Sequence, residues 1–226
     1  CSDLMLQKEY VIPDAAILEE GKAIVPGKLF CEIVRKLPEG EATLNLNAKS
    51  LDIVCGRAKS SIQCIEYEDF PEMRFDEESY SVSLKPEEWT SMINETVFAT
   101  AQDDSKPILT GVLMEFSDKV TLVATDAFQF AMRSTPLSQP VQECAVVAPG
   151  KTMLEIGRMM EETDKETALL FNKTHVRVRV NNTCLTARLL DGDYIKYRQI
   201  LPKSYETRVL IDRGELMESI DRAQLM

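Results

Sequence analysis

The sequence contains little of what metal and redox sites require. It has a single histidine, and its six cysteines (residues 1, 31, 55, 64, 144 and 184) include no Cys-x-x-Cys pair. A zinc site is therefore not expected, and no other metal or cofactor is predicted. Cys31, Cys55 and Cys64 lie in apolar periodic segments, where free thiols are expected to pack in the core.

The chain also lacks long apolar runs and an excess of basic residues. No apolar stretch approaches the roughly 18 residues of a membrane span. Free thiols without a secretory signal predict a cytoplasmic protein with no membrane partner. Asp and Glu number 37 against 26 Lys and Arg, a net charge of −11. This argues against a general nucleic-acid coat but leaves room for a basic stripe on one face.

One segment of the sequence occurs twice. Pro26-Gly27-Lys28 recurs as Pro149-Gly150-Lys151, 123 positions later. The same offset aligns Glu32 with Glu155, Ile33 with Ile156, Arg35 with Arg158, and Ser2-Asp3 with Thr125-Asp126. An offset of 124 aligns Ile65 with Leu189 and Phe70 with Tyr194, which predicts one inserted residue. A spacing this long indicates a duplicated domain, because solenoid repeats recur every 20–50 residues or so.

The repeat predicts three parts. Residues 1–75 are expected to be the rear of a first module, 76–203 a complete second module, and 204–226 the start of a third. Residue 1 aligns with the middle of the second copy, so the chain is interpreted as a fragment of a longer protein. Leu216 and Ile220 follow at the spacing of Trp89 and Ile93, which predicts a similar helix.

Each module is predicted to alternate short strands with two amphipathic helices. In the helix expected over 26–37, Phe30, Ile33, Val34 and Leu37 share one face. Further helices are expected from Pro86, over 149–160 and around Leu216, Ile220 and Ala223. Strands are expected over 43–47, 51–55, 61–65, 80–84, 108–116, 120–125, 128–134, 144–148, 168–172, 176–180, 185–190 and 208–211. The Val/Arg alternation of 176–180 is typical of a sheet with one wet face.

Taken together, these residues resemble the bacterial sliding clamp family, the beta subunit of DNA polymerase III. The segments that carry the likeness are residues 25–28, 69–71, 107–112, 123–126, 149–160, 187–192 and 197–202. The resemblance implies an α+β fold of tandem DNA-clamp modules, each with two amphipathic helices packed on antiparallel sheets. It also implies subunits that close head to tail into a ring around duplex DNA.

The resemblance implies a non-catalytic processivity factor of bacterial DNA replication. The expected partners are double-stranded DNA without sequence preference, the catalytic subunit of DNA polymerase III and the clamp loader. Other polymerases and repair proteins are expected to bind through short peptides, and the full-length protein is expected to be a homodimer.

A sliding ring must attract phosphate without fixing a register on the DNA, which exposed Lys and Arg on inward helices can do. The candidate DNA-facing residues are Lys28, Arg35, Lys36, Lys106, Lys151 and Arg158. The alternative is that they are ordinary solvated helix charges.

The family's second surface is a hydrophobic groove that captures partner peptides. Its matching positions here are Leu109, Thr125, Ala127, Phe128, Gln129, Phe130, Ile195, Gln199 and Ile200. The family usually has Gly-His-Arg-Leu at 127–130, Pro at 195 and Arg at 199, so this groove is expected to be less basic and more apolar. The alternative is that Phe128 and Phe130 are strand core residues on one face.

Two other functions remain open. One is a peptide-docking fragment that does not encircle DNA. The other is a nucleotide-binding enzyme using Gly150-Lys151-Thr152, although a phosphate-binding loop needs a glycine where Ala145 stands. No catalytic constellation is predicted, and Asp191 and Asp193 are expected to form a turn.

Overall fold

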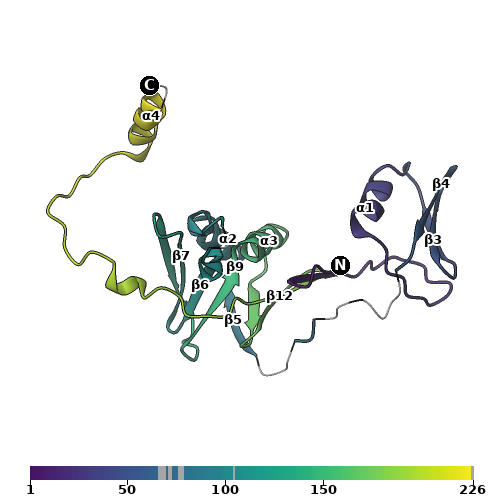
Figure 1. Cartoon of the computed structure of the whole chain (residues 1–226), viewed down its shortest axis with the longest axis horizontal. Coiled ribbons are helices and arrows are strands. Elements are labelled where there is room, and N and C mark those ends of the chain that lie inside the picture. Colours follow the sequence, from purple (N-terminus) through teal and green to yellow (C-terminus); the bar gives the residue numbers. More distant parts are fainter. Residues whose placement is uncertain (66–69, 71–72, 76–78, 104, 225–226) are drawn as a thin grey trace. The chain divides into compact units, whose positions relative to one another are not determined.

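The computed structural model describes residues 1–65, 70, 73–75, 79–103 and 105–224 (Figure 1). The chain divides into two units, Cys1–Tyr194 and Ile195–Met226. Residues 69 and 71 of the family-like motif, and residues 76–78 at the expected module boundary, lie outside the described residues. Within the described part of the chain, no helix has the length and apolarity needed to cross a bilayer.

A five-stranded antiparallel sheet joins segments that are far apart in the sequence. Its order is β1 (Leu6–Tyr10), β12 (Thr183–Arg188), β11 (His175–Val180), β10 (Thr167–Phe171) and β5 (Tyr80–Leu84). In β11 the three valines are buried, whereas Arg177 and Arg179 keep solvent access. The wet face predicted from the Val/Arg alternation is therefore confirmed. β1 crosses from the first predicted module to the second, a pairing that no local pattern indicates.

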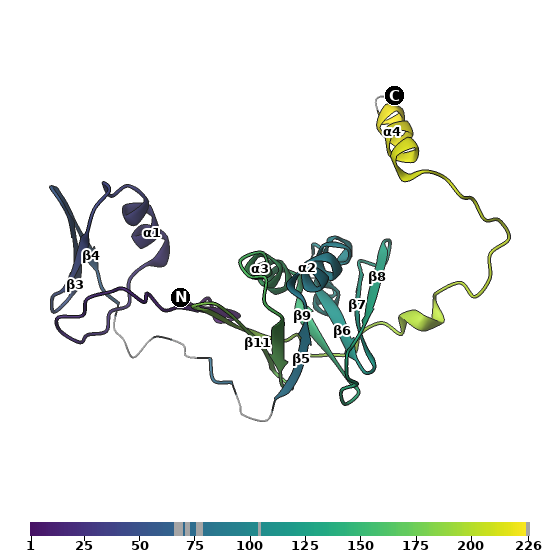
Figure 2. The same cartoon turned by 180° about the vertical axis from the view of Figure 1, so that it is seen from behind.

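A four-stranded antiparallel sheet and two helices complete the second module. The strand order is β8 (Phe130–Pro136), β7 (Lys119–Thr125), β6 (Gly111–Phe116) and β9 (Cys144–Pro149). Helices α2 (Pro86–Asn94) and α3 (Gly150–Met160) lie side by side (Figure 1, Figure 2). Trp89 and Ile93 are fully buried, as their helical spacing predicted, and Met153 and Ile156 of α3 are fully buried as well. The Trp89 indole donates to the carbonyl oxygen of Thr167 at 3.1 Å, so the buried N–H is satisfied.

The first module consists of one helix and a three-stranded antiparallel sheet. These are α1 (Gly27–Arg35) and the sheet β2 (Ala42–Leu46), β3 (Ser50–Cys55), β4 (Ala58–Gln63). α1 has no buried residue, and the predicted apolar face stays partly exposed, because no described helix packs on it as α2 packs on α3. Cys55 is buried and Cys64 half-buried, but Cys31 is exposed, so the prediction of a core thiol at Cys31 is wrong.

The two copies share the same backbone hydrogen bond. The N–H of Ile65 donates to the carbonyl oxygen of Ile24 at 2.8 Å, and the N–H of Leu190 donates to that of Val147 at 2.8 Å. Ile24 and Val147 are 123 positions apart, but Ile65 and Leu190 are 125 apart. The predicted offset of 124 is therefore wrong. The extra residues lie in the helix, since α3 has 11 residues and α1 has nine.

With this offset, β2, β3 and β4 correspond to β10, β11 and β12 strand for strand. The tight turns between the last two strands also correspond. Gly56 has a φ of 56° and Asn181 has a φ of 49°, a left-handed conformation that glycine and asparagine tolerate.

Several strand predictions need correction at one end or throughout. Residues 108–110 belong to the 3₁₀ turn η3 (Pro107–Thr110), because Pro107 starts a turn rather than a strand. Phe128 and Gln129 precede β8 and lie in a turn. Residues 208–211 form no strand and pair with no described strand, and Leu210 is 95% exposed.

Two further short turns and a last helix remain. η2 (Val97–Ala99) follows α2 in the first unit, and the second unit contains η4 (Tyr197–Gln199) and α4 (Arg213–Ala223). The Asp212 carboxylate accepts the N–H of Glu215 at 3.1 Å and caps α4, which confirms the predicted last helix.

Candidate functional site

The cations of α3 lie on the side of the helix that faces water. Lys151 and Arg158 are exposed, whereas Met153, Ile156 and Met160 are buried against the second module. Burial of the apolar stripe thus fixes which way the cations point. Arg158 forms an ion pair with Glu155 on the preceding turn.

The other four predicted DNA-facing cations are also exposed. Lys28, Arg35 and Lys36 lie on α1 and its C-terminal cap, and Lys106 precedes η3. Arg35 is placed in the last turn, where a cation is favourable beside the free carbonyl groups. Lys28 and Arg35 are the repeat counterparts of Lys151 and Arg158, so equivalent helices carry equivalent charges.

A hydrogen-bonded turn precedes β8. The Asp126 carboxylate accepts the N–H groups of Phe128 at 2.8 Å and Gln129 at 2.6 Å. The Thr125 hydroxyl accepts the N–H of Ala127 at 3.1 Å and donates to the carbonyl oxygen of Gln129 at 2.6 Å. Ala127 has a φ of 79°, a strained value for a residue with a side chain. The two N–H donors hold the pKa of Asp126 below its usual value, so the carboxylate stays ionised at neutral pH.

This turn presents Phe128 to water. Its side chain is 97% exposed, while Phe130, the first residue of β8, is half-buried. The alternative prediction that both rings are strand core is therefore wrong for Phe128. Gln129 is exposed as well, and Ala127 is exposed at the turn.

The other predicted groove positions of the first unit are buried. Leu109 is in η3 and Thr125 ends β7, and both are almost fully covered. Tyr194 lies nearby and is not among the predicted site residues. Its hydroxyl is within 3.5 Å of the carbonyl oxygens of Gly111 and Val123, and burial raises its pKa to about 12.

The remaining groove positions belong to the second unit. Ile195 is half-buried, and Gln199 and Ile200, which end and follow η4, are exposed. Their role as groove residues stays a prediction.

The first module contains the same turn. The Asp3 carboxylate accepts the N–H groups of Met5 at 3.0 Å and Leu6 at 2.7 Å, and Leu4 has a φ of 74°. The geometry therefore belongs to the module, and the special feature at the second copy is the exposed ring of Phe128.

The start of α3 is unsuited to phosphate binding. Gly150 is buried, and a Cβ there would lie 3.1 Å from both the Thr100 hydroxyl and the Thr110 carbonyl oxygen. Thr152 is also buried. Protein atoms thus fill the space that a phosphate-binding loop leaves open. Within the described ranges, no group of three or more His, Cys, Asp or Glu residues is placed to hold a metal ion.

The fold consists of tandem α+β clamp modules. Each copy supplies a helix with exposed Lys and Arg and antiparallel β-strands. The family model for the central domain of the DNA polymerase III beta subunit matches residues 83–196, and the model for its N-terminal domain matches residues 1–74. The chain belongs to the DNA polymerase III beta subunit family.

Individual proteins similar to this chain agree with the family assignment. The beta sliding clamp of Staphylococcus epidermidis is 28% identical over 212 residues, 93% of this chain and 56% of the relative. The sliding clamp structure from Bacillus subtilis has a TM-score of 0.89 at 26% identity and covers 98% of this chain and 61% of that one. The structure of the Pseudomonas aeruginosa sliding clamp bound to griselimycin has a TM-score of 0.89 at 28% identity. It covers 100% of this chain and 62% of that one. The chain thus spans a little over half the length of its relatives.

Proposed function

We propose that this chain is part of a processivity factor of bacterial DNA replication, a ring-forming sliding clamp that encircles duplex DNA. The observation that carries the proposal is the recurrence of exposed cations on α1 and α3, at Lys28 with Lys151 and Arg35 with Arg158. Exposed cations attract phosphate without reading bases, as a ring that moves along DNA requires.

The proposed clamp is a tether and performs no catalysis. Its partners are the catalytic subunit of DNA polymerase III, the clamp loader, and other polymerases and repair proteins with short docking peptides. The full-length protein is a homodimer in the cytoplasm. Residues 1–75, 76–203 and 204–226 remain our proposed rear of domain one, complete domain two and start of domain three.

The turn at residues 125–129 is the proposed centre of the peptide-docking surface. Phe128 supplies an apolar anchor, and no cation stands at 127–130. The preferred peptide is therefore apolar and does not depend on acidic residues. Support comes from the rigid hydrogen bonding of the turn, because a preorganised contact loses less entropy on binding. Leu109, Ile195, Gln199 and Ile200 remain proposed contributors.

The DNA-binding test compares circular and linear duplexes. The protein is loaded by the clamp loader onto nicked circular DNA, which is then cut once. A ring stays on the circle and is released after the cut, whereas a side-on binder is released from both at the same rate. Equal retention on the two topologies contradicts encirclement.

One alternative also has structural support. The 97% exposed Phe128 would serve a peptide-docking protein that never encircles DNA. Such a protein binds an apolar peptide with normal affinity but shows no topological retention. The two measurements made on one preparation therefore separate the two functions.

A further inference from the structure

The short segment 73–75, at the end of the first proposed module, contacts the wet face of the five-stranded sheet. The N–H of Met73 donates to Oε1 of Gln7 in β1 at 2.9 Å. The guanidinium carbon of Arg177 in β11 lies 4.5 Å from the centre of the Phe75 ring, which is a cation–π contact. The segment therefore contacts one strand of the first module and one strand of the second.

The burial of two polar residues shows where the segment covers the sheet. Gln7, Thr186 and Arg177 are neighbours in one row across β1, β12 and β11. Gln7 is 7% exposed and Thr186 is 1% exposed, whereas Arg179, two positions further along β11, is exposed. Polar side chains on a solvated face are buried this deeply where other atoms cover them, and residues 73–75 contact both ends of the row.

Both anchors of the segment are oriented by hydrogen bonds of their own. Gln7 Nε2 donates to Glu9 Oε1 at 2.8 Å, which leaves Gln7 Oε1 to accept the N–H of Met73. Arg177 Nε donates to the Thr186 hydroxyl at 2.9 Å, which orients the guanidinium group. Because both anchors are held in place by the sheet, less side-chain entropy is lost when the segment binds them.

The opposite face of β1 contacts the second module directly. Leu6 packs against the core of the second module, and the ammonium group of Lys8 lies 3.9 Å from the Glu155 carboxylate of α3. Successive residues of a strand face opposite ways, so Leu6 and Lys8 share one face and Gln7 lies on the other. β1 is therefore contacted on both faces, by the second module on one and by residues 73–75 on the other.

We propose that residues 73–75 form a latch that holds β1 on β12, with Arg177 binding the Phe75 ring and Gln7 binding the Met73 N–H. β1 leaves β12 only if the bond to Met73 breaks, or if the latch moves with β1 and loses the Arg177 contact. The latch thus restrains opening of the junction between the two modules. This inference goes beyond the proposed tethering function, and its tests need no DNA.

Trypsin tests whether the latch is seated, because the exposed Arg74 lies within it. Cleavage after Arg74 requires the segment to lift off the sheet, so its rate follows the population of the detached state. Arg177→Gln removes the cation and is expected to speed this cleavage about fivefold, as loss of a cation–π contact would do. Arg179→Gln, at an exposed arginine of the same strand and face, is the matched control and should leave the rate unchanged. Equal rates in the two variants overturn the proposal.

Two backbone amides report on the pairing of β1 with β12. The N–H of Arg188 donates to the carbonyl oxygen of Met5 at 2.9 Å, and the N–H of Val11 donates to that of Asn182 at 3.0 Å. These bonds lie at the two ends of the pairing and break when β1 leaves β12. The exchange of these two junction amides with deuterium therefore measures how often the junction opens.

Phe75→Ala removes the ring that Arg177 binds. Both junction amides are expected to exchange about fivefold faster than in wild type. The amide of Leu190, whose partner lies within the second module, should keep its rate. Because the two side chains form one contact, Phe75→Ala combined with Arg177→Gln should have less effect than the product of the two single effects. Wild-type exchange in Phe75→Ala, or the full product in the double variant, contradicts the latch.

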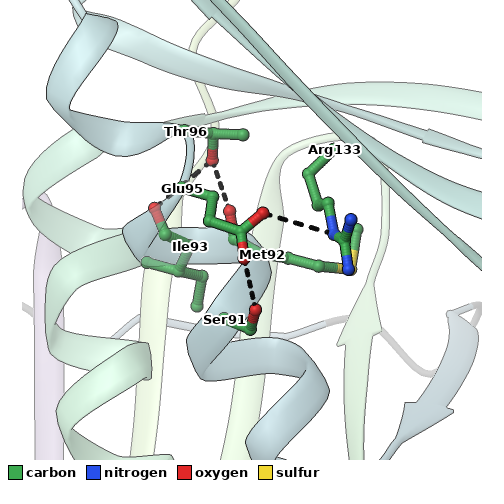
Figure 3. Close-up of polar contacts among 6 residues, drawn as sticks. All are labelled: Ser91, Met92, Ile93, Glu95, Thr96 and Arg133. Atoms are coloured by element: carbon green, nitrogen blue, oxygen red, sulfur yellow. Dashed lines mark hydrogen bonds and ion pairs between the residues drawn. The ribbon is translucent and has the colours of Figure 1, made fainter. Parts of the chain in front are cut away.

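An arginine contact within the second module gives a further control. Figure 3 shows Arg133 of β8 directed at Glu95, which follows α2, with 3.3 Å between Arg133 Nε and Glu95 Oε2. The Ser91 hydroxyl donates to the same carboxylate at 2.6 Å. Arg133→Gln removes this contact and should leave both junction exchange and cleavage of the latch at their wild-type rates. Acceleration equal to that of Arg177→Gln would show that loss of any such arginine loosens the protein, and the latch would be wrong.

Discussion

The ammonium group of Lys8 lies 3.9 Å from the carboxylate of Glu155, which also pairs with Arg158. One carboxylate thus lies between a cation of β1 and a proposed DNA-facing cation of α3. Exposed pairs of this kind contribute roughly 0–1 kcal/mol to stability. Their larger effect is on the charge that α3 offers to phosphate.

Glu155→Gln is expected to strengthen binding to duplex DNA, because Arg158 and Lys8 lose their carboxylate partner. Each added phosphate contact steepens the dependence of log K on log salt by about 0.9. Binding is measured by anisotropy across a salt series. Glu166→Gln removes an equal charge from an exposed position and serves as the control. Identical salt slopes for the two variants would show that Glu155 does not mask these cations.

The paired helix lysines make a second prediction. Replacing Lys28 and Lys151 together by glutamine is expected to weaken DNA binding and to flatten the salt slope by up to about 1.8. The fold should be unaffected, because both side chains are exposed. Arg179→Gln on the wet face of β11 is the matched control and should leave the slope unchanged. A slope that is the same in all three proteins places the DNA elsewhere.

Phe128→Ser is expected to weaken binding of an apolar partner peptide by about tenfold, as loss of a buried anchor of roughly 1.4 kcal/mol or more would do. The thermal midpoint should not change, because the ring makes no core contact at 97% exposure. Phe98→Ser, at a second exposed phenylalanine on η2, is the control. An unchanged peptide affinity would remove Phe128 from the docking surface.

The buried hydroxyl of Tyr194 is expected to make the free energy of unfolding fall in alkali. Burial raises its folded pKa to about 12, above the unfolded value of about 10. The proton is therefore held more tightly in the folded state. The contribution of protonated Tyr194 to folding stability is complete below pH 10 and is lost as pH rises toward 12.

The measurement is the free energy of unfolding in urea from pH 8 to pH 12, for wild type and Tyr194→Phe. The advantage of wild type should shrink by less than about 1.4 kcal/mol per pH unit, since the partly exposed site is screened by water. Parallel curves for the two proteins would show that Tyr194 keeps an ordinary pKa.

Local patterns predicted the helices and most strands well. Trp89, Ile93, Met153 and Ile156 recur at helical spacing, and their apolar faces find partners in the second module. The face of α1 has the same periodicity but stays partly exposed, because periodicity indicates which side is apolar and not what covers it.

Features that depend on side-chain hydrogen bonds or distant pairing were missed. Phe128 looks like a strand residue by alternation, but the carboxylate of Asp126 binds two N–H groups and turns the backbone first. The pairing of β1 with β12 joins segments more than 170 positions apart, which no local signal encodes. The two-residue extension of α3 has no mark in the sequence beyond a change of offset.

In the Asp126 turn, the residues that set the backbone conformation differ from the residue whose side chain is exposed at the tip. Thr125 and Asp126 set the backbone, and the side chain at position 128 contributes nothing to that geometry. Selection is therefore free to exchange the tip residue while the scaffold persists. Related proteins could therefore change their partner peptides one substitution at a time without a loss of folding stability.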